Sequence, residues 1–147
     1  MDNVFTIGFT EKTAKQFFAL LQKSSAKKLI DVRLNNTSQL SGFAKRDDLK
    51  FFLKEICDIE YVEVPDLAPE PKILKDYRNN LIDWERYELL YTELMAKRAV
   101  ERRVDPVLIT DACLLCSEHK PHHCHRRLAL EYLNKCWANS LKVKHLF

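Results

Sequence analysis

The chain concentrates thiol, imidazole and guanidinium groups in one short stretch. Residues 114–133 read LLCSEHKPHHCHRRLALEYL and hold two cysteines, two arginines and four of the five histidines in the chain. Such groups serve as metal ligands, as nucleophiles and proton carriers, or as contacts to an anion. An ordinary polar surface loop is the remaining alternative, so the elements around the stretch have to help decide.

A structural zinc site is one interpretation. Cys113, Cys116, Cys124 and His125 form a Cys-x2-Cys-x7-Cys-His series, which supplies the ligand types that zinc prefers. Residues 112–116 are predicted to form a strand, and side chains an odd number of residues apart point to opposite faces of a sheet. We therefore expect no closed zinc site. A metal-binding structural or regulatory protein that uses Cys116, Cys124, His125 and a further histidine stays open as an alternative.

An anion site fits the stretch better. The helix predicted from about Arg126 onward places Cys124 and His125 at its start, where free amides attract anions and lower the pKa of a thiol. Arg126 adds donors for phosphate or carboxylate. Cys124 is therefore a candidate nucleophile and His125 a candidate acid or base. A buried cysteine beside a solvated basic turn is the alternative without function.

Cys116 and Glu118 are further candidates for the catalytic group, because both face the same way if the strand continues. A nearby carboxylate raises the pKa of a thiol unless Arg33 or Arg126 offsets it. We therefore rank Cys124 ahead of Cys116 as the reactive thiol. The Cys-x5-Arg loop of cysteine-dependent phosphatases is excluded, because His122 occupies the arginine position.

The remaining sequence predicts the frame that positions these groups. Strands are expected at 4–8, 28–33, 60–64, 112–116 and 142–146, and helices at 11–23 with a simple Thr10 cap, 47–57, 83–103 and 126–138, with residues 66–82 irregular in their first part. This alternation predicts one Rossmann-like, three-layer α/β domain over 1–147, with a mostly parallel sheet flanked by helices.

Ligands in such folds bind at the carboxyl ends of the strands, which here carry Gly8, Arg33 and Cys116. We expect these three residues to meet Cys124, His125 and Arg126 in one cleft. Asp31 and Arg33 share a strand face, where an internal ion pair and a ligand contact are equal alternatives. The aromatic residues are interpreted as packing groups and not as a platform for bases: Tyr61, Tyr77, Trp84 and Tyr87.

Composition limits the protein class. The chain has 147 residues with 24 Lys and Arg against 21 Asp and Glu, and this net charge of +3 does not by itself indicate nucleic acid. No signal peptide or membrane-spanning segment is recognisable, so we expect a cytoplasmic protein with no membrane partner. Its five cysteines are then expected to be reduced, with Cys57, Cys113 and Cys136 buried and inert.

Several segments in the same order resemble the uncharacterised bacterial and archaeal family known as domain of unknown function 488. They are FTIGFT near the start, LIDVR, YVEVPDL and above all LLCSEHKPHHCHRRLALEYL. The family pattern falls on Gly8, Asp31, Arg33, Cys116, Glu118, Cys124, His125 and Arg126, with His145 matching a histidine near the family's C-terminus. The chain departs at Leu67-Ala68-Pro69, where many members carry a Leu-Gly-Gly turn. The resemblance implies a fold and a site, and no reaction.

Together these observations favour a site for a phosphate-bearing or nucleic-acid ligand, with Gly8, Asp31, Arg33, Arg126 and His145 as ligand-binding residues. An enzyme that uses a reactive thiol is compatible with this site, and no cofactor is indicated. A non-catalytic nucleic-acid-binding module, in which Arg33, Arg126 and Arg127 contact phosphates, is the third alternative.

Overall fold

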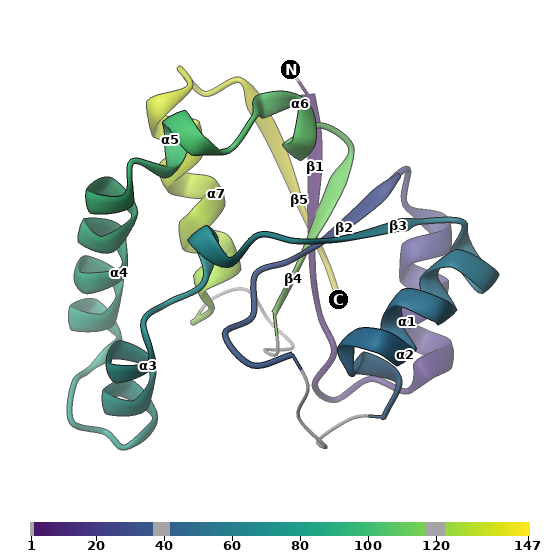
Figure 1. Cartoon of the computed structure of the whole chain (residues 1–147), viewed down its shortest axis with the longest axis horizontal. Helices are drawn as coiled ribbons and strands as arrows, with labels where there is room; N and C mark the ends of the chain where they lie inside the picture. The colour runs from purple at the N-terminus through teal and green to yellow at the C-terminus, as the bar shows by residue number, and fades with distance from the viewer. Residues whose placement is uncertain (1, 37–41, 117–122) are drawn as a thin grey trace.

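The computed structural model describes residues 2–36, 42–116 and 123–147. Five strands form one sheet in the order β3-β2-β4-β1-β5, and every pair of neighbours is parallel (Figure 1). The strands are β1 Asp2–Gly8, β2 Lys28–Asp31, β3 Glu60–Glu63, β4 Ala112–Cys116 and β5 Leu141–Leu146. All five predicted strands are therefore confirmed, with small shifts at their ends.

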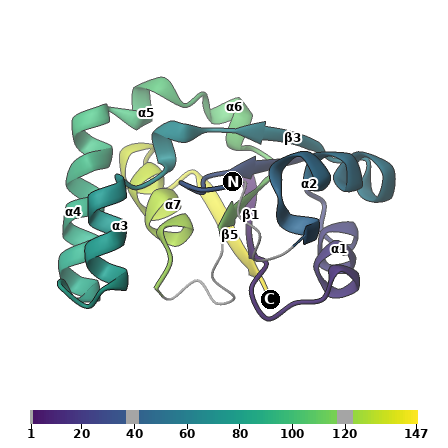
Figure 2. The same ribbon diagram turned by 60° about the horizontal axis from the view of Figure 1, so that its bottom comes forward.

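Helices cover both faces of the sheet, as predicted (Figures 1 and 2). One face carries α1 Ala14–Lys23, η1 Gly42–Ala44, α2 Arg46–Phe52 and the π-helical turn η2 Leu53–Cys57. The other carries η3 Pro65–Leu67, α3 Pro71–Arg78, α4 Trp84–Arg98, α5 Val100–Arg103, α6 Pro106–Ile109 and α7 His125–Cys136. The fold is thus a three-layer α/β arrangement with a core on each side of a parallel sheet.

Alternate side chains of β4 belong to the two different cores. Leu114 and Cys116 belong to the core under α4 and α7, whereas Cys113 and Leu115 belong to the core under α1 and α2. Successive side chains of a strand point to opposite faces, so this division follows from the strand itself. The sequence-based expectation that Cys113 and Cys116 cannot share a site is confirmed.

Local capping corrects the predicted start of the first helix. Glu11 adopts a left-handed backbone (φ 62°), so the chain turns after Thr10 and the helix begins only at Ala14. Thr13 caps it: its side chain accepts from the Gln16 amide, and the Gln16 side chain accepts from the Thr13 amide. The prediction of a simple Thr10 cap was wrong, because a full capping box lies three residues later.

The long helix predicted at 83–103 is two helices. Ala99 has a left-handed backbone (φ 52°) that ends α4, and α5 begins at the next residue. The segment before α4 contains a helix, α3, that no clear periodicity indicated, with Pro71 at a first-turn position where proline is tolerated. These two corrections matter because α3 and the start of α4 form one wall of the cleft described below.

The turn at Leu67-Ala68-Pro69 is tied to α4. The Tyr91 hydroxyl donates to the Leu67 carbonyl (2.6 Å), and Arg98 donates to the Ala68 carbonyl (2.6 Å). These contacts hold the turn on the α4 side of the molecule, and it does not line the cleft.

The topology opens this cleft at the carboxyl edge of the sheet. β1 is followed by α1 on one face, while its neighbour β4 is followed by α7 on the other face. Neighbouring strands whose connections leave toward opposite faces form the switch point at which α/β proteins bind ligands. Within the described parts of the chain, no helix combines the length and apolarity needed to cross a bilayer.

Candidate functional site

Three of the predicted residues lie together at the carboxyl edge of the sheet. Gly8 and Cys116 are register partners at the ends of β1 and β4, and Asp31 pairs with Leu115 at the end of β2. The parallel register therefore brings residues from distant parts of the chain to one edge. Glu118, the fourth candidate for a catalytic group, lies outside the described residues.

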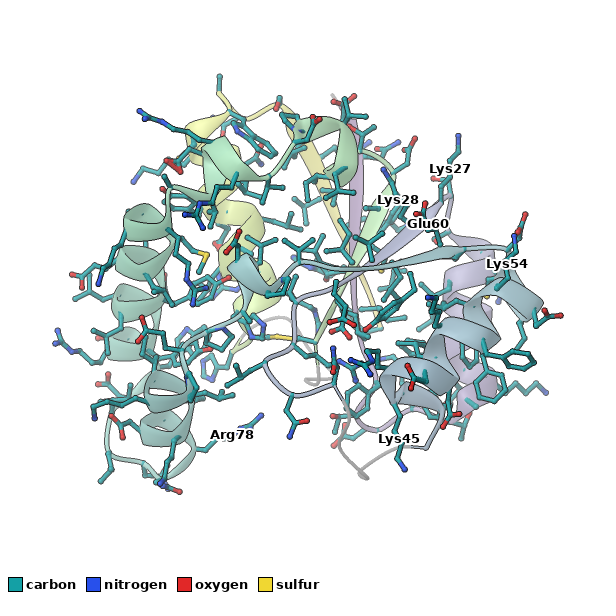
Figure 3. The ribbon with its side chains drawn as sticks, viewed as in Figure 1. Lys27, Lys28, Lys45, Lys54, Glu60 and Arg78 are labelled. Carbon is teal, nitrogen blue, oxygen red and sulfur yellow. A yellow bond between two sulfur atoms is a disulfide. The ribbon has the colours of Figure 1, made fainter. Side chains whose placement is uncertain are left out.

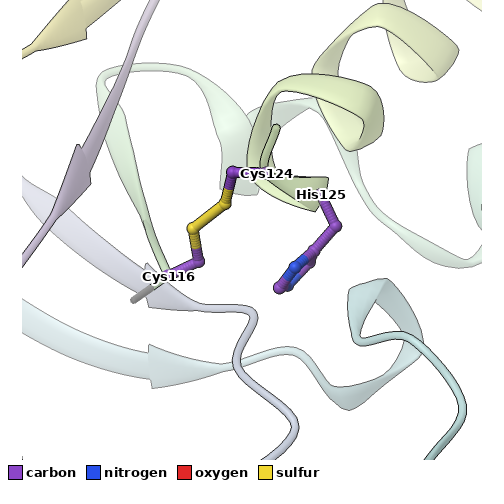
Figure 4. Close-up of side chains that lie close together, drawn as sticks. All are labelled: Cys116, Cys124 and His125. Atoms are coloured by element: carbon purple, nitrogen blue, oxygen red, sulfur yellow. A yellow bond between two sulfur atoms is a disulfide. The ribbon is translucent and has the colours of Figure 1, made fainter. Parts of the chain in front are cut away.

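Cys116, Cys124 and His125 form a compact cluster (Figure 4). Their sulfur and nitrogen ligand atoms all lie within 4.8 Å of one another, and all three residues are buried. β4 delivers Cys116, while the start of α7 delivers Cys124 as the N-cap residue and His125 as the first helical residue. A trio of this composition could hold a soft metal ion, and Cys113 would not be one of its ligands.

The two sulfurs of this cluster are bonded to each other. Cys116 and Cys124 form a disulfide, with an S–S distance of 2.00 Å. The expectation that all five cysteines are reduced is therefore not met in this structure. Cys57, Cys113 and Cys136 are free; Cys57 is only half-buried and Cys136 is exposed, so the prediction of burial fails for these two and holds for Cys113.

Cys113 is the most deeply buried of the three free cysteines. It is fully buried in the core under α1 and α2, and this burial raises its pKa far above the ordinary value of a thiol. The low dielectric of this core disfavours the charged thiolate, and this effect outweighs the positive charge of Arg126 on the other face of the sheet.

Arg126 places a buried cation against the cluster. Its side chain is fully buried at 0% exposure, and its Nη1 donates to Cys116 Sγ over 3.3 Å. Once the disulfide is reduced, a guanidinium at this distance would favour the thiolate form of Cys116. The sequence analysis expected Arg126 and the helix amides to stabilise a thiolate at Cys124. In the structure the Cys124 side chain makes no capping hydrogen bond to those amides. The printed contact reaches Cys116, and the order in which the two thiols react stays a prediction.

A second cation approaches Arg126 from the loop after β1. Burial lowers the pKa of Lys12, and the positive charge of Arg126 lowers it further. Lys12 is not among the residues that line the cleft beside Cys116 and Cys124.

His125 is held in one orientation and one protonation state. Its Nε2 lies 2.7 Å from the backbone carbonyl of Val32, which can only accept, so this nitrogen carries the proton. Burial lowers the pKa of His125 to about 4, only partly offset by the bond to Val32. The ring is thus neutral at pH 7, and its Nδ1 is the lone-pair nitrogen available as a base or as a ligand.

Asp31 and Arg33 form an internal ion pair. Arg33 donates from Nε and Nη2 to the two carboxylate oxygens of Asp31 (2.9 and 2.8 Å) and from Nη1 to the Ala44 carbonyl (2.7 Å). Tyr61 donates its hydroxyl to the same carboxylate, and the guanidinium lies over the Phe9 ring. The bidentate pair supports the structural alternative, although Arg33 also lines the cleft.

His145 lies farther away, on the edge strand β5. Its Nδ1 is 2.6 Å from the Thr6 hydroxyl on β1, and it is not among the residues that line the cleft. Of the residues predicted to converge on one cleft, Arg33, Cys116, Cys124 and His125 line it. Gly8 and Arg126 lie near the same edge of the sheet but are not among the lining residues, and neither are Asp31 and His145.

The opposite wall of the cleft comes from residues to which sequence reasoning gave no functional role. α3 and the start of α4 present Leu74, Tyr77, Arg78, Trp84 and Tyr87, which face the Cys116–Cys124 pair and His123. Arg78 is exposed, and in the described part of the chain it makes no ion pair (Figure 3). The clustering of three aromatic residues and two arginines within 77–87 was the available signal.

Fold and site together define a class: a parallel α/β protein with a Cys/His/Arg cluster at the carboxyl edge of its sheet. The family model Domain of unknown function DUF488 matches residues 13–133, and the chain belongs to this family. Comparison with curated proteins and with solved structures finds no match. The family assignment confirms the resemblance and establishes no activity.

Proposed function

We propose that the cleft at the carboxyl edge binds a phosphate-bearing ligand, such as a nucleotide or a nucleic-acid strand, next to a reactive thiol pair. The observation that carries the proposal is the convergence of Cys116, Cys124 and neutral His125 on the buried guanidinium of Arg126. Arg33 and the exposed Arg78 place positive charge in the lining of the same cleft.

The site combines the groups that thiol chemistry on an anionic ligand needs. Reduction of the disulfide by an external thiol or phosphine, with two electrons and two protons, gives two thiols. The Arg126 donor favours the thiolate at Cys116, and Nδ1 of His125 can accept a proton from Cys116 or Cys124. Arg33, whose donors are largely committed to Asp31, is a supporting group and not the main anion contact.

Differential alkylation of the reduced protein tests both parts of this proposal. Cys116 and Cys124 should react with iodoacetamide far faster than Cys113, and exposed Cys136 serves as the reference for a freely accessible thiol. Millimolar inorganic phosphate or ribose 5-phosphate should slow the labelling of Cys116 and Cys124 and leave Cys136 unchanged. Site-by-site mass spectrometry supplies the rates.

The matched variants are Arg126→Gln and Arg127→Gln. Arg126→Gln should slow the labelling of Cys116 and abolish the protection by phosphate, because it removes the buried donor. Arg127, the next residue along α7, pairs with Glu131 at the surface, so its variant should behave as the parent protein. Equal labelling with and without phosphate would refute the anion site, and a Cys116 rate no faster than that of Cys113 would refute the reactive thiol.

Metal binding is the second candidate function, and the geometry of one cluster favours it. The ligand atoms of reduced Cys116 and Cys124 and of His125 lie close enough to share one ion. Three protein ligands leave a fourth position open, as in catalytic zinc sites. Stoichiometric zinc bound by the reduced protein and lost in Cys124→Ser, with Cys113→Ser as the control, would support it. Less than one zinc per chain would exclude a tight site.

A further inference from the structure

A stack of aromatic rings runs from the core to the rim of the cleft. The Tyr87 and Trp84 rings lie 5.1 Å apart at an interplanar angle of 20°, and the Trp84 and His123 rings lie 4.8 Å apart at 22°. Tyr77 packs at an angle against Trp84 and Tyr87 (5.6 and 5.1 Å). Tyr87, Trp84 and His123 thus form a series of near-parallel planes, and Tyr77 packs beside it at an angle.

The stack becomes more exposed along its length. Tyr87 is buried, Trp84 is half-buried, and His123 at the outer end is exposed. Packing alone explains Tyr87, which belongs to the core beneath α4. It does not explain why an imidazole at the surface lies flat on the indole at the mouth of the cleft. A planar ring ending such a series offers its plane to another planar ring.

The stack adjoins the sulfurs and the cations. His123 is the residue before Cys124, and Tyr77 is the residue before Arg78; all four line the same cleft. Arg78 is close enough that its charge, after burial and Arg126, helps to lower the pKa of His125. A ligand at this rim would therefore meet an aromatic plane and a cation together.

We infer that the ligand of this cleft is a nucleotide unit, whose base stacks on the His123–Trp84 rings while its phosphate lies toward Arg78. The inference rests on the proposed phosphate site and deepens it by naming the ligand class. A sugar phosphate or inorganic phosphate has no planar ring and would leave the stack unused. A free nucleotide and a single-stranded nucleic acid share the required chemistry, because every base has a stacking face.

Stacking of one base on an aromatic side chain changes affinity by roughly 5- to 150-fold. We therefore expect AMP to bind more tightly than ribose 5-phosphate, which carries the same phosphate and sugar without the base, by a factor in about this range. The difference between these two probes isolates the stack, because the phosphate contacts are common to both.

The two tryptophans of the chain make the test direct. Trp137→Phe leaves Trp84 as the single tryptophan, and Trp137 lies at the end of α7 outside the cleft. The reduced Trp137→Phe protein is titrated with AMP, ribose 5-phosphate and a short single-stranded oligodeoxyadenylate. Calorimetry gives each affinity, and AMP and the oligonucleotide should quench the Trp84 fluorescence.

His123→Ala, made in the same background, is the decisive variant. It should lower the affinity for AMP to that of ribose 5-phosphate and leave the ribose 5-phosphate affinity unchanged. Because His123 is exposed, its truncation should not disturb the fold. Phe51→Ala is the matched control: Phe51 is 60% exposed on α2, over the other face of the sheet, and its loss should change neither affinity.

Each outcome decides the question. A preference for AMP that His123→Ala removes supports the inference, and the tighter of AMP and the oligonucleotide identifies the source of the nucleotide unit. Equal binding of AMP and ribose 5-phosphate, or a preference that survives in His123→Ala, overturns the inference and leaves the proposed phosphate site standing. Binding of neither probe overturns both.

Discussion

The ion pair between Asp31 and Arg33 gives the sharpest prediction about stability. The Asp31 side chain is 0% exposed and the Arg33 side chain 5% exposed. The carboxylate accepts from the Arg33 backbone amide, from its Nε and Nη2, and from the Tyr61 hydroxyl. Asp31→Asn keeps the volume of the side chain, removes its charge and turns one acceptor into a donor that faces other donors.

The expected cost of Asp31→Asn is about 3–5 kcal/mol of unfolding free energy, because the guanidinium stays buried without its counter-charge. That is a large share of the roughly 5–15 kcal/mol that stabilises a typical domain. Asp47→Asn is the matched control. The Asp47 side chain is 85% exposed in its pair with Arg46, and exposed pairs contribute only about 0–1 kcal/mol.

Urea unfolding followed by circular dichroism measures both variants, with an unchanged m-value confirming that the same transition is compared. Arg33→Met combined with Asp31→Asn should cost less than the sum of the single changes, because the double variant buries no unpaired charge. A loss below about 1 kcal/mol for Asp31→Asn would refute the structural role, and Arg33 would then be better explained as a ligand contact.

Two other predictions follow from the helix cap and the buried imidazole. Thr13→Ala should cost about 1 kcal/mol, because it removes the capping box with Gln16, whereas exposed Ser25→Ala should cost almost nothing; thermal unfolding compares the two, and equal values would contradict the cap. The folded-state pKa of His125 is lowered to about 4 from 6.5, so the unfolded chain binds the additional proton as pH falls through this window. Stability should therefore decrease by up to about 3 kcal/mol between pH 6.5 and 4, and His125→Gln should flatten that part of the pH profile. An imidazole that titrates near 6.5 by NMR would show that the ring is not buried as described.

The sequence by itself determined the layered fold and part of the site. Period-two and period-3.6 patterns are local, so they predicted the five strands and helices at 11–23 and 126–138 without knowledge of any partner; the structure has these helices at Ala14–Lys23 and His125–Cys136. Parity within one strand likewise separated Cys113 from Cys116. The parallel arrangement then placed Gly8, Asp31 and Cys116 at one edge, because carboxyl ends of parallel strands lie together.

Sequence patterns were less successful where the backbone leaves the regular conformations. The left-handed residues Glu11 and Ala99 moved the start of α1 and divided the helix predicted at 83–103, since a non-glycine residue in that region is stabilised by its surroundings and not by its own preference. The helix α3 was missed for a related reason: its partly buried side chains pack against the α4 side of the core, and none of its residues is fully buried.

Only the tertiary structure decided how the site residues are used. It directed the Arg126 guanidinium to Cys116 and not to Cys124, and it fixed the His125 ring on the Val32 carbonyl, 93 positions away in the chain. It also brought Trp84 onto His123 to form the outer wall of the cleft. Contacts of this kind depend on strand order and on the packing of α3, α4 and α7 against the sheet. These contacts cannot be predicted from residues that are near in sequence. They join elements that are distant in the chain, and the packing of the whole core sets the relative positions of those elements.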